Sequence, residues 1–144
     1  MPTLLSAIHA SASGLDAERA RMEVAASNLA NADSTRGPNN EPYRRRSVVL
    51  ESTDGGDSFG ATLDRANAST GVKVAGVVED QSAFRRRYEP SHPDADADGF
   101  VAEPNVDVPD EMVDMLGAAR AYQANLTAIS LIRDTITKAL ELAK

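Results

Sequence analysis

The feature that most constrains this chain is the spacing of apolar side chains at its two ends, where they recur every seven residues. Near the N-terminus, four residues share this spacing: Ile8, Leu15, Met22 and Leu29. Leu5 lies three residues before Ile8, and alternating intervals of three and four place side chains on one face of an α-helix. The pattern predicts a helical N-terminal segment, residues 1–32, of the kind that packs against other long helices.

The C-terminal segment, residues 108–144, repeats this spacing in two adjacent registers. The first register consists of Met115, Tyr122, Ile129 and Ile136. The second register consists of Met112, Ala119, Leu126 and Leu140. Arg133 interrupts the second register. Asp107 and Asp110, on either side of Pro109, predict the start of this helix because acidic residues and proline favour the first helical turn.

Between the two helices, residues 33–107 hold most of the glycine and proline and predict a β-rich insertion. Three stretches have β-like sequence: residues 43–50, 71–78 and 83–88. Asp98-Gly99 predicts a hairpin turn, and residues 51–59 predict a loop. The predicted fold is mainly α with a small β-rich insertion, with the terminal helices packed as a coiled-coil-like pair in an elongated subunit.

The composition argues against several classes of function. A net charge of -7 and a pI near 4.8 argue against nucleic-acid binding, which needs a basic surface. Cysteine is absent, so we expect no disulfide, thiolate metal site or thiol nucleophile. His9 and His92 are the only histidines, too few for a histidine metal cluster. Because no nucleophile elbow or phosphate-binding glycine loop occurs either, we expect no catalytic residue, no metal and no cofactor.

The N-terminus has no basic leader and no continuous apolar block, so we expect no cleavable signal peptide. No apolar run approaches the length that a membrane span needs. The two alanine-rich stripes can pair with each other, yet that pair leaves apolar residues such as Leu131 and Ile132 exposed. We therefore expect contacts with other chains, and a contact that does not close into a ring generates a helical assembly.

Three groups of polar residues each allow two interpretations. Asp94, Asp96 and Asp98 match the first half of a calcium-binding loop, but Asn105 stands where the bidentate glutamate is needed. We prefer a carboxylate-rich turn at a subunit interface. The only basic clusters are two arginine triplets: Arg44, Arg45, Arg46 and Arg85, Arg86, Arg87. They are either solvated strand residues that discourage edge pairing or partners of an acidic patch on a neighbouring subunit.

The third group lies on the helical stretches and consists of Asn28, Asn31, Gln123 and Asn125. One interpretation places these side chains at exposed positions or at a frayed helix end. The other gives them hydrogen bonds that fix the register of helices inside an assembly, as a buried asparagine does in coiled coils. We favour the second interpretation, because the sequence around these residues resembles that of a family of proteins that assemble through their helices.

Several motifs resemble the flagellar rod and hook protein family, and within it the proximal rod proteins. The N-terminal motifs are Ser13-Gly14-Leu15, Ala25-Ala26-Ser27-Asn28-Leu29-Ala30-Asn31 and Thr35. The central motifs are Pro42-Tyr43-Arg44-Arg45, Gly76-Val77-Val78-Glu79-Asp80-Gln81-Ser82, the run from His92 to Gly99, and Pro104-Asn105-Val106. The C-terminal motifs are Glu111-Met112-Val113 and the run from Ala118 to Asn125. The resemblance covers almost the whole chain and is weakest over residues 51–69.

The resemblance implies a structural subunit of the bacterial flagellar basal body. Such proteins are exported uncleaved by the flagellar type III apparatus and form the periplasmic proximal rod, which links the membrane ring and export gate to the distal rod and hook and transmits torque. The implied partners are copies of the chain, other proximal rod proteins, the ring-to-rod adaptor protein and the distal rod protein. An alternative from the helical stripes alone is a soluble helical adaptor or export chaperone.

The expected interface consists of the helix-stripe residues and the helical asparagines. These are Leu5, Ile8, Leu15, Met22, Asn28, Leu29, Asn31, Met112, Met115, Ala119, Tyr122, Asn125, Leu126, Ile129, Ile136 and Leu140. The two arginine triplets and the three aspartates at 94, 96 and 98 are expected as interface charge clusters.

Overall fold

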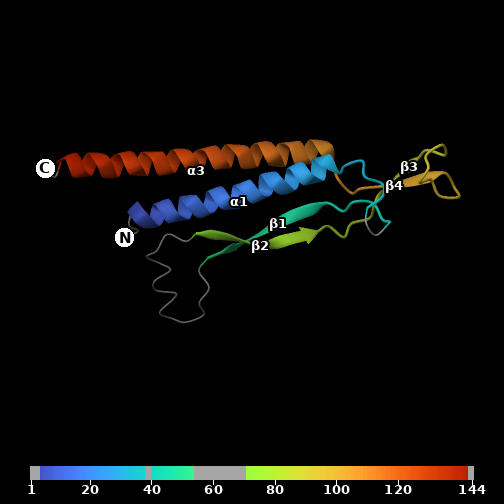
Figure 1. Ribbon diagram of the computed structural model, residues 1–144, viewed down its shortest axis with the longest axis horizontal. Helices are drawn as coiled ribbons and strands as arrows, with labels where there is room; N and C mark the ends of the chain where they lie inside the picture. The colour runs from blue at the N-terminus through green and yellow to red at the C-terminus, as the bar shows by residue number, and fades with distance from the viewer. Residues whose placement is uncertain (1–3, 38–39, 54–70, 143–144) are drawn as a thin grey trace, which may run out of the picture. The chain divides into compact units, whose positions relative to one another are not determined.

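A computed structural model describes residues 4–37, 40–53 and 71–142 (Figure 1). Two long helices, α1 (Leu4–Ala30) and α3 (Val108–Leu142), contain 27 and 35 residues. Four strands lie between them in the sequence: β1 (Arg46–Ser52), β2 (Val72–Glu79), β3 (Arg85–Tyr88) and β4 (Phe100–Glu103). The prediction of a mainly helical chain with a small β-rich insertion is confirmed. The coiled-coil geometry of the helix pair stays a prediction.

The ends of both helices have local causes in the sequence. Asn31 ends α1, because its backbone N–H is shared between the carbonyls of Ser27 and Asn28 and its side-chain Nδ2 donates to the Ser27 carbonyl at 2.8 Å. Asp107 precedes α3, and its carboxylate accepts a hydrogen bond from the N–H of Asp110. Asp110 and Glu111 then place negative charge in the first turn, where the helix dipole favours it.

The strands form two separate two-stranded sheets, β1 with β2 and β3 with β4. The β3–β4 pair is antiparallel, with Arg85 opposite Glu103 and Tyr88 opposite Phe100. The predicted turn at Asp98 and Gly99 is only the last part of the connection, which runs over residues 89–99. The predicted loop at 51–59 is wrong at its start, because β1 continues through Ser52, and its remainder from residue 54 lies outside the described residues.

Residues of the chain group into two compact units. The first unit consists of Met1–Ala20, Val49–Gly76 and Gly117–Lys144, and the second consists of Arg21–Val48 and Val77–Leu116. Each unit therefore takes part of both helices and part of the intervening sequence. The three-segment division with boundaries at 32 and 107 stays a prediction.

In the first unit, small residues lie where α1 packs against α3. Ala17 of α1 and Ala118 of α3 are buried, and Gly14 of α1 contacts the side chain of Asn125 on α3. The Ser13 hydroxyl donates to the Ala10 carbonyl at 2.8 Å and accepts a hydrogen bond from the backbone N–H of Val72 at 3.0 Å. One serine thus fixes the start of β2 on the surface of α1.

In the second unit, the core is small and partly polar. Its fully buried side chains include Val101, Val106 and Pro104, together with Asn28 and Glu111. Polar groups at such positions destabilise a protein unless each one has a hydrogen-bond partner. The partners of Asn28 and Glu111 therefore decide whether this unit is stable.

Among the glycines that the structure describes, Gly99 is the one with a left-handed backbone, because its φ is +81°. A Cβ there would also lie 3.0 Å from the Tyr88 ring and 3.1 Å from Pro90. We expect Gly99→Ala to lower the free energy of unfolding by about 1–2 kcal/mol. Gly117→Ala is the matched control: its Cβ would meet nothing within 4 Å, and the better helix former should raise stability by up to about 1 kcal/mol. Urea unfolding followed by circular dichroism measures both, and equal effects would contradict the account of Gly99.

Candidate functional site

Asn28 lies at the centre of a buried polar cluster in the second unit. Its side chain is 0% exposed and makes four hydrogen bonds. Nδ2 donates to the Arg46 carbonyl at 2.8 Å and to Oε2 of Glu111 at 2.9 Å. Oδ1 accepts from the Arg46 N–H and from the Tyr43 hydroxyl, each at 2.9 Å. One carboxamide therefore pairs with the backbone of β1 as a neighbouring strand would, and also connects α1 to α3.

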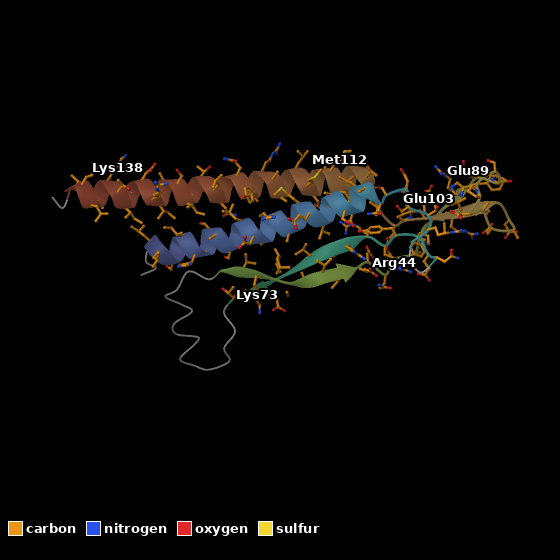
Figure 2. All side chains as sticks on the ribbon, in the orientation of Figure 1. Arg44, Lys73, Glu89, Glu103, Met112 and Lys138 are labelled. Atoms are coloured by element: carbon orange, nitrogen blue, oxygen red, sulfur yellow. The ribbon has the colours of Figure 1, made fainter. Side chains whose placement is uncertain are left out.

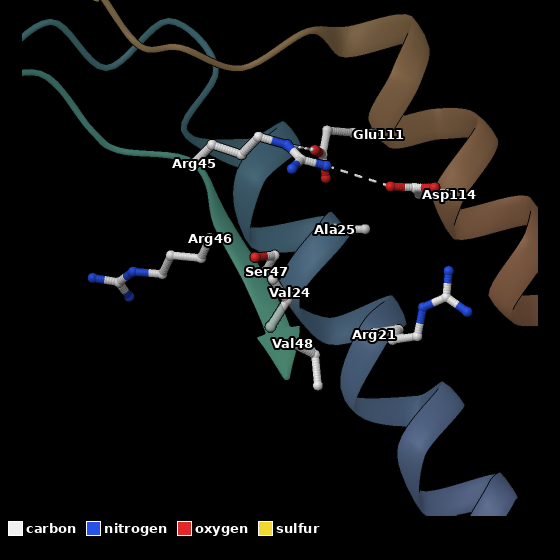
Figure 3. Close-up of a pocket in the computed structure, with 9 residues that line it drawn as sticks. All are labelled: Arg21, Val24, Ala25, Arg45, Arg46, Ser47, Val48, Glu111 and Asp114. Atoms are coloured by element: carbon white, nitrogen blue, oxygen red, sulfur yellow. Dashed lines mark hydrogen bonds and ion pairs between the residues drawn. The ribbon is translucent and has the colours of Figure 1, made fainter. Parts of the chain in front are cut away.

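Glu111 in the first turn of α3 is 1% exposed, and Arg45 balances its charge. Nε of Arg45 lies 2.5 Å from Oε1 of Glu111, and Nη2 lies 3.4 Å from Asp114 (Figure 3). Burial opposes the charged form of Arg45, but the hydrogen bond and charge of Glu111 outweigh it and raise the pKa of Arg45. Arg45 therefore keeps its charge and is hydrogen-bonded to Glu111, which is the arrangement in which a buried polar group is tolerated.

Asn105 extends the cluster on the side of β2. Its Oδ1 accepts from the Arg45 N–H at 2.8 Å, while Nδ2 donates to the Asp80 carbonyl and the Ser82 hydroxyl. The Asp80 N–H donates to the Arg45 carbonyl at 2.8 Å. We call Asn28, Arg45, Asn105 and Glu111 the polar cluster. It joins α1, the start of β1, the end of β2 and the segment before α3.

A cavity of about 270 Å³ lies beside the polar cluster (Figure 3). It is lined by Arg21, Val24, Ala25, Arg45, Arg46, Ser47, Val48, Glu111 and Asp114. Arg45 is paired with Glu111 and Asp114, and Arg46 with Glu79 at 3.0 Å. Within the described ranges, no group of three or more histidine and acidic side chains is placed to hold a metal ion. The hydrogen bonds and ion pairs around this cavity fix β1 to α1 and α3 within the second unit.

All six residues of the arginine triplets contact groups of their own chain. The Arg44 guanidinium lies 4.2 Å from the Phe84 ring centroid, and Arg85 donates to the Val106 carbonyl at 3.0 Å. Arg86 pairs with Asp96 at 2.7 Å, and Arg87 with Glu103 at 2.9 Å. Neither earlier interpretation anticipated these internal pairs. An interface role for the triplets stays a prediction.

The acidic turn is also held by donors from its own chain. Asp94 accepts from the Thr35 hydroxyl at 2.8 Å and pairs with Arg36. Oδ1 of Asp96 accepts from the N–H groups of Phe100 and Asp98. The pKa of Asp96 is lowered, and the largest cause is the hydrogen bond from the Phe100 N–H. Hydrogen bonds from Arg86 and from the Asp98 N–H lower it further. These contacts show why carboxylates recur in the turn, and its role at a subunit interface stays a prediction.

Comparisons with known proteins identify the family. A family model described as "Flagella basal body rod protein" matches residues 8–38, and one described as "Flagellar basal body rod FlgEFG protein C-terminal" matches residues 97–142. The chain is 45% identical to the flagellar basal-body rod protein FlgC of Bacillus subtilis, over 99% of both chains. It is 43% identical to FlgC of Salmonella typhimurium over 98% of both, and 36% identical to FlgC of Borreliella burgdorferi over 95% of both. The chain belongs to the FlgC family.

Members of the FlgC family are structural proteins of the flagellar basal-body rod and not enzymes. This chain is therefore a structural rod subunit of the bacterial flagellum, and rod subunits assemble with other rod components. The prediction from the sequence motifs is confirmed. In the part of the chain that the structure describes, neither helix combines the length and apolar character needed to cross a membrane.

The predicted interface residues of this FlgC-family chain fall into three classes of exposure. Asn28 is buried. The half-buried residues are Ile8, Leu15, Met22, Leu29, Asn31, Met115, Tyr122, Asn125, Ile129 and Ile136. The exposed residues are Leu5, Met112, Ala119, Leu126 and Leu140. The exposure of a residue in one chain does not test whether it contacts another chain in the rod. The interface role of each of these residues therefore stays a prediction.

The side of α3 that packs within the chain matches one of the two predicted registers. The other register lies one residue away from the buried positions Glu111 and Ala118. Its buried and half-buried positions include Glu111, Met115, Ala118, Tyr122, Asn125, Ile129, Ile132 and Ile136. The register of Met115 therefore lies on this side, whereas the register of Met112 does not. Apolar periodicity missed Glu111 and Ala118 because one is charged and the other is small. The sequence pointed to Glu111 through the family motif Glu111-Met112-Val113, which gave it no structural role.

The register of Met112 belongs to a second, uncovered apolar face of α3. Met112, Leu116 and Leu126 are 50%, 59% and 45% exposed. Figure 2 shows side chains along the whole of α3, with Met112 labelled near its start and Lys138 near its end. We call Met112, Leu116, Ala119 and Leu126 the open stripe. Exposed apolar residues in such a row mark a surface for other proteins.

Proposed function

We propose that this chain is a proximal-rod subunit that acts in the periplasm, after export without cleavage by the flagellar type III apparatus. In that position it links the membrane ring and export gate to the distal rod and hook, and it transmits torque. Its partners are copies of itself, other proximal rod proteins, the ring-to-rod adaptor protein and the distal rod protein. Membership of the FlgC family supports the proposal.

The open stripe is the observation that supports assembly most directly. A helix of 35 residues that exposes leucine and methionine along one face is poorly suited to an isolated subunit. The stripe can be covered by long helices of neighbouring subunits, which gives a coiled-coil-like inner layer of the rod. The polar cluster acts within each subunit, where it holds β1 and the two helices in one arrangement under load.

Leu126→Asp tests this function in the open stripe. We expect a folded chain with a melting temperature close to the original, because Leu126 is 45% exposed. Rod assembly should nevertheless fail, because the new carboxylate would be buried against a neighbouring chain. The measurement is rod formation and motility in a flagellated strain that lacks its own copy of the protein.

Thr127→Asp is the matched control on the same helix. Thr127 is exposed, lies outside the open stripe and donates its hydroxyl to the Gln123 carbonyl of its own helix. The same added charge there should leave rods intact. Normal rods with Leu126→Asp would contradict the assignment of the open stripe as an interface.

A further inference from the structure

Asn125 is the polar residue of α3 whose position the subunit's own fold does not explain. The described parts of α1 and α3 contain one asparagine each, Asn28 and Asn125. Asn28 makes four side-chain hydrogen bonds, whereas the carboxamide of Asn125 makes none within the described ranges. Asn125 is half-buried on the side of α3 that faces α1. Its donors and acceptor are therefore available to another molecule.

Gly14 of α1 makes the space for this side chain. A Cβ at residue 14 would lie 2.8 Å from Nδ2 of Asn125 and 3.3 Å from Cγ. Gly14 lies inside a helix, where glycine is less stable than alanine, and its φ is not in the left-handed region. Alanine at 14 facing a smaller apolar residue at 125 would give a more stable helix pair. The chain instead has glycine at position 14, and the Asn125 side chain that packs over it makes no hydrogen bond within the described residues.

The residues around Asn125 are apolar. Tyr122 and Ile129 are half-buried one turn away on either side, and Leu126 of the open stripe is its direct neighbour. A helix that covers Leu126 also removes water from the Asn125 carboxamide. A buried carboxamide without a partner is strongly unfavourable, so the covering helix has to supply one. One polar residue in an apolar helix interface fixes the register of the pair and rejects other registers.

Building on the proposed rod function, we propose that Asn125 hydrogen-bonds to a helix of a second copy of this chain and sets the register in which copies pack. The partner has to present a long helix that combines exposed apolar residues with small ones. This chain presents both: Leu4 and Leu5 are exposed on α1, and α1 is rich in alanine and serine. Small residues allow the close approach that a short carboxamide needs.

Asn125→Leu separates a role in assembly from a role in the fold. We expect the purified variant to melt at or above the temperature of the original chain, because the half-buried position gains an apolar side chain. Rod formation in a strain that lacks its own copy should fall by about tenfold or more, because the partner group is left unpaired. Thr127→Leu, at an exposed position outside the open stripe on the same helix, is the control and should form rods normally.

A second variant, Asn125→Ala, covers the case in which leucine clashes with Gly14. If Leu and Ala both lower the melting temperature, Asn125 serves the subunit's own fold and the proposal is wrong. Normal rods with either well-folded variant also overturn it. The unchanged chain tests the proposed function separately: its failure to restore rods would remove that function, whereas rods with both the unchanged chain and Asn125→Leu would remove only the register role.

The partner itself can be identified by a photo-crosslinking amino acid at position 125 in assembled basal bodies. The proposal predicts a product of twice the chain mass, whose crosslinked peptide comes from a helix of a second copy. A crosslink to a different rod protein, with none to a second copy, would overturn the assignment of the partner.

Discussion

Arg45→Met is expected to lower the free energy of unfolding by about 3 kcal/mol or more, the range found when one partner of a buried ion pair is removed. The reason is the carboxylate that remains. Glu111 is 1% exposed, and without Arg45 its carboxylate keeps only the hydrogen bond from the Asn28 carboxamide within the described residues. Urea unfolding of the purified chain, followed by circular dichroism, measures the change.

Arg46→Met is the matched control within the same triplet. Arg46 pairs with Glu79, and the side chains of both are 47% exposed. An exposed pair contributes roughly 0–1 kcal/mol, so this variant should unfold close to the original. The mutant Glu111→Met should be milder than Arg45→Met, because the Arg45 side chain is 28% exposed and retains Asp114. Equal losses in the three variants would contradict the view that Glu111 carries the buried charge.

Asn28→Leu is expected to have an effect of similar size, about 3–5 kcal/mol, because it leaves several buried polar groups unpaired at once. The groups that lose a partner are the N–H and C=O of Arg46, Oε2 of Glu111 and the Tyr43 hydroxyl. Leucine has a similar volume but restores none of these bonds. The loss should appear in the same urea experiment as a lower midpoint.

Asn31→Leu is the control for this second prediction. Asn31 is half-buried, and its Nδ2 bonds to the Ser27 carbonyl of its own helix. Losing that bond should lower the free energy of unfolding by about 1 kcal/mol. A double-mutant cycle between Asn28 and Glu111 should also show coupling, because their side chains are directly bonded at 2.9 Å. Additive effects would show that the polar cluster does not act as a unit.

The sequence predicted both helices because their signals are local. Apolar spacing located the register of Met115, and Asn31 and Asp107 indicated where the helices end and begin. The strand predicted at residues 43–50 forms at Arg46–Ser52, because its sequence does not alternate strictly and its end at Ser52 runs into polar residues. Local patterns of this kind define elements better than their bounds.

The polar cluster could not be predicted in the same way. Arg45 and Glu111 are 66 residues apart, and each is an ordinary surface residue by type. Asn28 was expected to hydrogen-bond, but the sequence does not show that its partners are β1 and Glu111. Part of the packed side of α3 was missed because Glu111 is charged and Ala118 is small, although both are buried. Small and polar residues at close contacts leave no apolar pattern.

A density map of the intact basal body tests the central claim most directly, because it shows which surfaces of each subunit meet other chains. The account predicts that the open stripe, from Met112 to Leu126, packs against helices of neighbouring subunits, while the polar cluster stays within one chain. A map in which the open stripe faces solvent or the export channel would contradict it.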